Sequence, residues 1–433
     1  MSFLEFTLPT AATWFYFSAL LAVALFFKFS RFLSVRNWDV VALFLLVPGL
    51  LLLRQSGWEP IGYVWLFAGS AYFLARCLLD LTLVQRPALA PNLTLGGLAW
   101  MAGTLFICLV AVAFNREPDK RADRPGKDPL LTQEAEKQAT RVVEQQAQAN
   151  NVPTFDTRVW VGRSLAVLCH LAVFVGLVVV GRRHFQDLHA GMAAATFYLL
   201  LPYTAFHVEL WHHVWPMALV VWAVVFYRKP TLAGLLLGLA AGTVYFPLLI
   251  LPVWWSFYWG RGSGRFLGAF ALTFGLCLSA TGLILWYDNE LANSIQSLRT
   301  LPDWQPWLPP AAGTKGFWTG MEWAWAYRMP VFVACMGLTV GTAFWPSPKN
   351  LAHVLALSAA ALIGVQFWYA DQGGVYVLWY LPLLLLLAFR PNLSDRRPLP
   401  INPDSDWLFR LGRLTLRAAA RVARLPEAPV PQR

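Results

Sequence analysis

The chain has 433 residues, of which 58% are hydrophobic and only 13% are charged. A soluble enzyme of this length needs a more polar surface, so the composition excludes that class and predicts a multi-pass membrane protein. The net charge of +11 comes from Lys and Arg residues beside apolar segments, which indicates membrane orientation rather than nucleic-acid binding. Five cysteines lie inside apolar segments without metal or redox spacing, as small buried side chains do: Cys77, Cys108, Cys169, Cys277 and Cys335.

The fold class predicted from these segments is all-α, a transmembrane helical bundle with about 12 apolar spans. In lipid, a backbone can satisfy its hydrogen bonds locally only as a helix. The spans are predicted at 13–30, 38–53, 61–82, 93–114, 160–181, 190–205, 214–227, 231–258, 264–287, 329–345, 350–369 and 375–389.

The basic loops predict the orientation, because short loops rich in Lys and Arg remain cytoplasmic. Placing Lys28 and Arg31 inside puts the N-terminus outside, and the alternation then brings Arg182 and Arg183 inside as well. Arg54 is the one basic residue in a short loop on the outer side. The C-terminus is predicted to be cytoplasmic.

The segment 115–158 is predicted to be a long external loop. It carries eight basic and eight acidic residues and is therefore neutral. Its centre from Thr132 to Ala149 is rich in Glu, Gln and Ala, which predicts a solvated helix with Thr132 as N-cap.

The loop before the span at 214–227 contains four residues whose side chains can bind a metal or a phosphate. Three interpretations of this loop are possible. They are contact with a substrate or phosphate, binding of a divalent metal, and a structural role at the membrane surface. We expect no metal or other cofactor. The residues are His207, Glu209, His212 and His213.

The span at 231–258 is long, and basic residues lie at both of its ends. Gly242 and Pro247 are near its middle, where each weakens a continuous helix. We predict two short helices that form a hairpin and return to the cytoplasmic side. A single tilted span with a kink is the alternative.

The segment 288–328 is predicted to be a second external loop that covers the outer face. Its prolines favour irregular structure, and its tryptophans are typical either of a membrane-interface belt or of surfaces that stack on sugar rings. Basic side chains such as Arg299, Lys315 and Arg328 are suited to holding a phosphate.

The tail contains a predicted basic amphipathic helix at 404–425. Arginines recur there every three or four residues beside an apolar stripe. Such a helix is suited to lying on anionic lipids of the inner leaflet. Docking of a cytoplasmic partner is the alternative.

The order of these elements resembles the GT-C superfamily of membrane glycosyltransferases, in particular its bacterial polyprenyl-phosphate-mannose-dependent branch. The resemblance covers roughly residues 93–260. Three features carry it: the long loop between two spans, Gly181-Arg-Arg-His-Phe185, and the phrase from Pro230 to Ala240 followed by Phe246-Pro-Leu-Leu-Ile-Leu-Pro252. It implies a GT-C-like core at 93–389, preceded by extra helices at 1–92 and followed by a tail at 390–433.

The resemblance implies that an aspartate of the first large external loop acts as general base on an acceptor hydroxyl. Asp156 is the preferred residue because it lies just before the next span, at the membrane surface. The other candidates are Asp119, Asp123 and Asp128.

The implied function is transfer of a sugar from a polyprenyl-phosphate donor to an extracytoplasmic acceptor, at a bacterial plasma membrane. His207, Glu209, His212, His213, Arg299, Lys315 and Arg328 are then the residues expected to bind the substrate. Two alternatives remain: a transporter or flippase whose cavity is lined by 231–258, and a non-catalytic scaffold that recruits partners through 115–158 and the tail.

Overall fold

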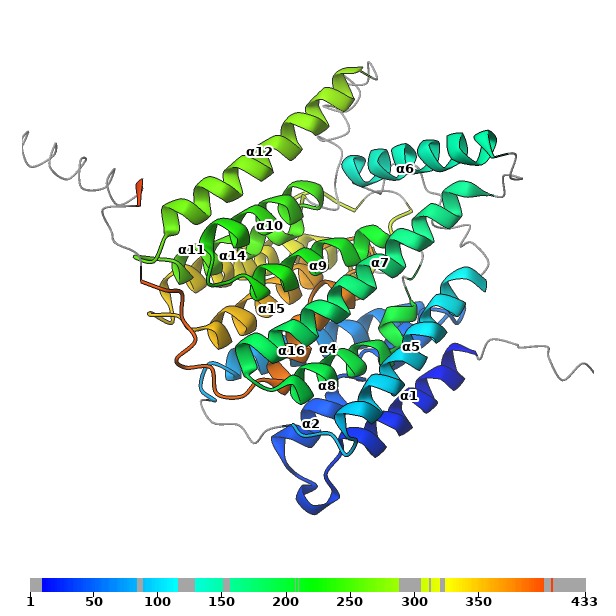
Figure 1. Cartoon of the computed structure of the whole chain (residues 1–433), viewed down its shortest axis with the longest axis vertical. Helices are drawn as coiled ribbons and strands as arrows, with labels where there is room; N and C mark the ends of the chain where they lie inside the picture. The colour runs from blue at the N-terminus through cyan, green and yellow to red at the C-terminus, as the bar shows by residue number, and fades with distance from the viewer. Residues whose placement is uncertain are drawn as a thin grey trace, which may run out of the picture.

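The described residues of the computed structural model form helices and connecting turns, and no β-strand occurs among them (Figure 1). Within the part of the chain that the structure describes, seven helical segments are long and apolar enough to cross a membrane. The predicted all-α class is therefore confirmed, with several helices suited to a membrane. The structure describes residues 10–83, 89–115, 129–150, 156–206, 208, 210–287, 305–310, 313–319, 324–400 and 406–407.

Every predicted span overlaps helical residues. The span predicted at 38–53 is divided in two by a turn at 43–46. Helices α8, α9 and α10 have 13 to 15 residues, fewer than the roughly 20 of a full crossing, so the helix lengths do not confirm about 12 crossings. The helices are α1 (Ala11–Phe26), α2 (Val35–Ala42), α3 (Val47–Leu52), α4 (Glu59–Leu79), α5 (Leu95–Asn115), α6 (Leu130–Ala149), α7 (Thr157–Val180), α8 (Leu188–Leu200), α9 (Trp211–Val225), α10 (Pro230–Thr243), α11 (Leu251–Phe257), α12 (Ser263–Tyr287), α14 (Arg328–Phe344), α15 (Leu351–Trp368) and α16 (Leu381–Phe389).

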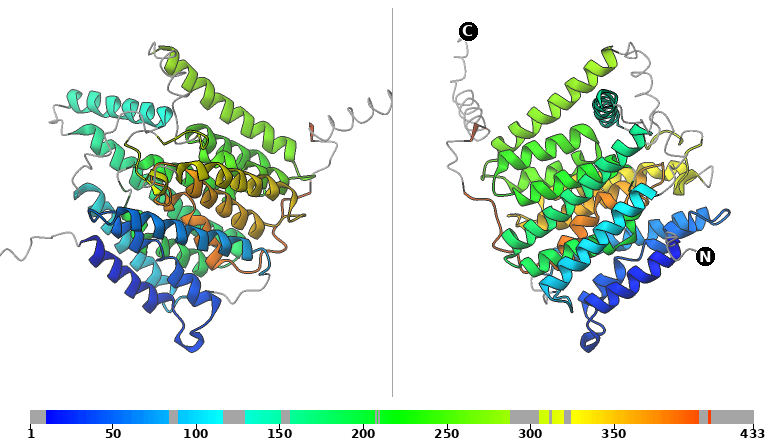
Figure 2. Two further views of the ribbon diagram at one scale, coloured as in Figure 1. Left: turned by 180° about the vertical axis from the view of Figure 1, so that it is seen from behind. Right: turned by 45° about the vertical axis from the view of Figure 1, so that its right-hand side comes forward.

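Helix α15 lies in the interior of the bundle (Figures 1 and 2). Its most apolar stretch is 94% buried, whereas that of α12 is 17% buried. A helix that is apolar on all sides belongs in the protein interior, while α12 presents apolar residues outward, as a lipid-facing helix does. Helices α4, α14 and α16 pack against α15. The N-terminal and C-terminal helices therefore share one core.

The hairpin predicted within 231–258 is present. Helix α10 ends, the 3-10 turn η4 (Phe246–Ile250) reverses the chain, and α11 follows. The hydroxyl of Tyr258, after α11, donates a 2.7 Å hydrogen bond to the carbonyl of Tyr227, before α10. Both residues are buried. The two ends of the hairpin therefore meet at one end of the bundle, which excludes the single tilted span.

Glycines explain how the hairpin packs against α12. A Cβ added at Gly234 would collide with the carbonyl of Phe266, and one added at Gly238 would collide with Thr273. Gly242 continues the series and also faces α12. Small residues four apart allow two helix backbones to approach closely. The glycine-rich phrase of α10 is therefore the packing face of the hairpin.

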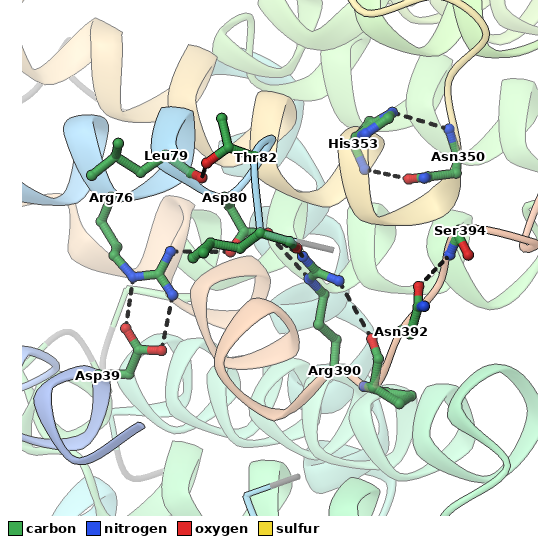
Figure 3. A network of polar contacts seen from close by, with 12 residues as sticks. Asp39, Arg76, Leu79, Asp80, Thr82, Asn350, His353, Arg390, Asn392 and Ser394 are labelled. Carbon is green, nitrogen blue, oxygen red and sulfur yellow. Dashed lines mark hydrogen bonds and ion pairs between the residues drawn. The ribbon is translucent and has the colours of Figure 1, made fainter. Parts of the chain in front are cut away.

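The turns at one end of the bundle contact one another and carry many of the basic residues; we call this the basic end. The Nη1 of Arg261 donates to the carbonyl of Pro398 at 2.6 Å, and the amide of Leu351 donates to the carbonyl of Arg396 at 2.8 Å. Figure 3 shows the polar contacts around Arg390 in this region. The basic end comprises the turns at 27–36, 80–83, 181–187, 226–229, 258–265, 345–350 and 390–398.

The opposite end, called the loop end, contains longer connections and helix α6. The helix is present as predicted, but the expected N-cap is wrong, since Pro129 occupies that position. The expectation of a solvated helix is also wrong on one face, because Thr132 is 2% and Thr140 is 8% exposed. The reason is that α6 packs against α7, α10 and α12. Of the described residues, the loop end comprises 53–58, 129–150, 156, 201–206, 244–250, 305–310, 313–319 and 369–380.

Candidate functional site

Four rings form a column at the loop end, where the hairpin turn meets the segment before α16. The ring of Trp379 stacks on Phe246 with centroids 3.9 Å apart and on Tyr376 at 4.3 Å. The ring of His213, in the first turn of α9, follows at 5.3 Å from Tyr376. Three separate segments thus contribute to one structure. We call Phe246, Trp379, Tyr376 and His213 the aromatic column.

The loop at 369–380 supplies half of the column, and its main-chain geometry explains how. Gln372 and Gly374 have φ angles of 54° and 94°, in the left-handed region that glycine adopts readily. The amide of Gly374 donates to Oε1 of Gln366 at 2.8 Å. Irregular backbone at membrane depth is tolerated where protein buries it or where it lines a cavity. The tight turn therefore directs the next residues back into the bundle.

Glu136 of α6 connects the starts of two other helices. Its Oε1 accepts a hydrogen bond from Nε of Arg158 at 3.2 Å, and its Oε2 accepts one from Nε1 of Trp211 at 3.1 Å. The side chain of Arg158 is 62% exposed, so this ion pair stabilises little. Trp211 is only 7% exposed, and its bond is better shielded from water. The carboxylate thus links α6 to α7 and α9, and the link through Trp211 is the stronger of the two.

The Glu136 bridge links the starts of two helices that carry predicted site residues. Asp156 is the N-cap residue of α7, two residues before Arg158, and its exposed side chain makes no capping hydrogen bond. His212 and His213 directly follow Trp211, and their ring centroids are 4.3 Å apart. Along the chain, Asp156 therefore lies two residues before one partner of Glu136, and His212 and His213 directly follow the other partner.

Lys315 and Arg328 border the loop at 369–380. The carbonyl of Lys315 accepts a 2.7 Å hydrogen bond from the amide of Gln372, while its side chain is exposed. Arg328 is fully buried, and its guanidinium donates to the carbonyls of Trp368 at 3.1 Å and Leu308 at 3.2 Å. Arg328 therefore fastens the described part of the segment 288–328 to the end of α15.

Several predicted residues lie outside the described part of the chain. The preferred base and four of the predicted substrate contacts can be placed, whereas the other candidates cannot. Of the tail helix predicted at 404–425, only two residues are described: the carboxylate of Asp406 accepts from the amide of Gly264 at 3.1 Å, and Nε1 of Trp407 donates to the carbonyl of Gly264 at 2.7 Å. The residues that lie outside are Asp119, Asp123, Asp128, His207, Glu209 and Arg299.

Among the described residues, no three side chains of His, Cys, Asp or Glu form a group that could hold a metal ion. Two members of the set considered for a metal, His207 and Glu209, are not described. His212 and His213 are both half-buried beside the aromatic column. Imidazole N–H groups in this position suit hydrogen bonding to an oxygen-rich ligand.

Glu136 is the site residue that the sequence reasoning missed. It lies in the segment predicted to be a solvated helix, whereas the residues predicted as catalytic in the same loop are aspartates. A signal was present, because Thr132, Glu136 and Thr140 recur every four residues and so share one helix face. That polar face is the one that packs against the bundle.

Comparison with known proteins gives no relative for this arrangement. No protein-family model, no curated protein and no solved structure matches the chain.

Proposed function

We propose that the protein is an integral membrane glycosyltransferase of GT-C type, which moves a sugar from a polyprenyl-phosphate donor to an extracytoplasmic acceptor. The basic end faces the cytoplasm of a bacterium, and the loop end faces outward with the N-terminus. The tail helix at 404–425 lies on anionic inner-leaflet lipids. The proposal draws on the order of elements along the chain and on the arrangement at the loop end.

The observation that carries the proposal is the Glu136 bridge. Through Arg158 and Trp211 it links the start of α7, beside Asp156, to the start of α9, beside His212 and His213. A base for an acceptor hydroxyl and donors for a leaving phosphate are the two groups that this transfer requires. Both oxygens of Glu136 accept hydrogen bonds from side chains of the protein, so we assign it a positioning role.

The proposed step is a single displacement at the anomeric carbon. Asp156 accepts the proton of the acceptor hydroxyl while that oxygen bonds to the anomeric carbon. The bond between the anomeric carbon and the phosphate oxygen breaks, and its electron pair leaves with the polyprenyl phosphate. His212 and His213 donate hydrogen bonds to the phosphate, and Lys315 offers an exposed ammonium group beside the same loop.

Arg328 has a different role in this proposal from the one expected of it. Its guanidinium donates to two carbonyls and is fully buried. We therefore assign it to holding the second external loop in place over the site.

Native mass spectrometry of the gently purified full chain tests the proposal without knowledge of the sugar or acceptor. We expect a stoichiometric polyprenyl phosphate to co-purify, and to be lost when His212 and His213 are both changed to Ala. Retention of bulk phospholipid alone, with carrier lipid added in excess, would reject the transferase in favour of a transporter or a scaffold.

A further inference from the structure

Arginines from three turns of the basic end lie near one buried histidine. His184 belongs to the π-helical turn η2 (Gly181–Phe185), which follows α7, and is only 4% exposed. Positive charges from the turns at 181–187, 226–229 and 390–398 act on its imidazole. They are those of Arg183, Arg228 and Arg396. Three segments that are distant in the sequence therefore bring positive charge to one place.

His184 joins two of these turns. Its Nε2 lies 2.9 Å from the carbonyl oxygen of Val225, at the end of α9, and donates to it because a carbonyl can only accept. Its ring forms an edge contact with the ring of Tyr227, with centroids 4.7 Å apart. The carbonyl of Tyr227 is itself held by the hydroxyl of Tyr258. The turn after α7 and the turn after α9 are therefore fixed side by side.

Tyr227 also positions Arg228. The Cζ of Arg228 lies 5.8 Å from the centroid of the Tyr227 ring, within the range of a cation–π contact. Its Nε donates to the Tyr227 hydroxyl at 3.3 Å. The Nη groups of Arg228 have no partner among the described residues. Because the side chain is exposed, these groups can donate to a ligand at the surface.

The other two arginines also have donors available. The side chains of Arg183 and Arg396 form no hydrogen bond or ion pair with any residue in the described part of the chain. Arg183 is exposed and Arg396 is half-buried. The main chain of Arg396 is fixed, because its carbonyl accepts from the amide of Leu351 at 2.8 Å. Both guanidinium groups can therefore bind a ligand without breaking an existing contact.

The three turns carry an excess of positive charge. The carboxylate of Asp187 accepts from the amide of Ala190 at 3.0 Å and so caps α8, while Asp395 forms no ion pair among the described residues. Like charges repel each other, so a bound anion lowers the electrostatic energy of these turns. Against the two acidic residues stand seven basic ones: Arg182, Arg183, Arg228, Lys229, Arg390, Arg396 and Arg397.

We infer that Arg183, Arg228 and Arg396 form a binding site for a phosphate group, supplied by the headgroup of an anionic phospholipid. The planar fork of a guanidinium matches two phosphate oxygens. Arg183 lies near the end of the apolar segment Thr157–Phe185, which is long enough to cross a membrane, and lipid headgroups lie at the ends of such segments. Free phosphate has the same chemistry, and the experiment separates the two sources. The inference does not depend on the proposed sugar transfer.

The experiment measures binding of phosphatidylglycerol to the purified full chain by native mass spectrometry, in competition with zwitterionic phosphatidylcholine. We expect the wild type to prefer phosphatidylglycerol. Arg183→Gln, Arg228→Gln and Arg396→Gln should each weaken its binding about tenfold, the usual effect of losing a charge-assisted hydrogen bond. Lys229→Gln is the matched control, because it removes the same charge from an exposed neighbour of Arg228. It should bind as the wild type does.

Two further variants separate positioning from charge. Arg228→Lys keeps the charge but loses the planar fork, and Tyr227→Phe keeps the ring but removes the hydroxyl that accepts from Nε of Arg228. Both should bind phosphatidylglycerol more weakly than the wild type and more strongly than Arg228→Gln. In detergent without lipid, the three Gln variants should melt as the wild type does, which establishes that the fold is retained.

Inorganic phosphate in excess identifies the source of the phosphate group. We expect it to leave phosphatidylglycerol bound, because the acyl chains add apolar contacts that free phosphate lacks. Displacement of the lipid by phosphate would overturn the headgroup as the ligand. If the three Gln variants bind phosphatidylglycerol as the wild type does, the site is wrong. If Lys229→Gln weakens binding as much as Arg228→Gln does, the attraction belongs to the whole basic end, and the site is wrong as well.

Discussion

Asp80 and Arg390 form a buried ion pair between the N-terminal helices and the end of α16 (Figure 3). The Nη2 and Nε of Arg390 donate to Oδ2 of Asp80 at 2.8 and 3.1 Å. The other oxygen of Asp80 accepts from Arg76, which also holds Asp39. The side chains of the Asp80–Arg390 pair are 1% and 2% exposed. Four charges thus balance within the protein at the basic end.

Changing Asp80 to Asn should destabilise the fold strongly. Removing one partner of a buried ion pair leaves a charge without compensation and costs about 3–5 kcal/mol. Thermal unfolding in mild detergent measures the effect, with exposed Arg183→Gln as control. The double variant Asp80→Asn with Arg390→Gln should lose less than the sum of the single variants. Strict additivity would show that the two residues are not coupled.

The hairpin predicts that both of its ends are reached from the same side of the membrane. In a Cys108→Ala background, cysteines at Lys229 and Trp259 should react with a membrane-impermeant maleimide from the same face as one at Arg183. A cysteine at Trp58 should react from the opposite face. All four positions are exposed. Labelling of positions 229 and 259 from opposite faces would exclude the hairpin.

Glu136→Gln should loosen helix α6. The neutral amide cannot form the charge-assisted bonds to Arg158 and Trp211, so amide hydrogen exchange in α6 should become faster. The matched control is Glu134→Gln on the same helix, since Glu134 contacts Lys137 and Gln138 one turn further along. Equal exchange in the two variants would mean that the bridge does not hold α6.

The free energy of unfolding should depend on pH because Lys349 is buried in the folded chain. Burial lowers the pKa of Lys349 from 10.5 to about 8. Between these values the unfolded chain binds the proton and the folded chain does not, so stability rises as the pH rises from about 8 to 10.5. The melting temperature of the wild type relative to Lys349→Met should therefore increase from pH 8 to pH 10. A constant difference would show that the pKa is not lowered.

The sequence was sufficient for features that depend on local pattern. The fold-back of 231–258 was predicted from basic residues at both ends and from Gly242 and Pro247 between them, and the structure has it. Helix α6 was predicted from its composition, with its end within a residue of that found. The lengths of the apolar segments predicted where helices occur. They did not reveal which helices, such as α8, are too short for a full crossing of the membrane.

The sequence was insufficient for features that depend on tertiary pairing. The partners of Glu136 lie 22 and 75 residues away, and Arg390 lies 310 residues from Asp80. No periodicity links residues over such separations. Arg54 shows the intermediate case: its location against the predicted charge pattern was visible in the sequence, but the Phe206 ring 4.4 Å from its Cζ was not. The predicted aspartate base remains a prediction.

The proposed glycosyltransferase activity is tested most directly by measuring sugar transfer from a polyprenyl-phosphate-linked hexose. Membranes containing the wild-type chain, and with it the endogenous acceptors, should convert the donor to free polyprenyl phosphate. Asp156→Asn should lower this rate at least about 100-fold, as loss of a general base does, while Glu134→Gln should leave it unchanged. Donor consumption by Asp156→Asn at the wild-type rate would contradict the assignment of the base. Absence of any turnover by the wild type would contradict the proposed transferase itself.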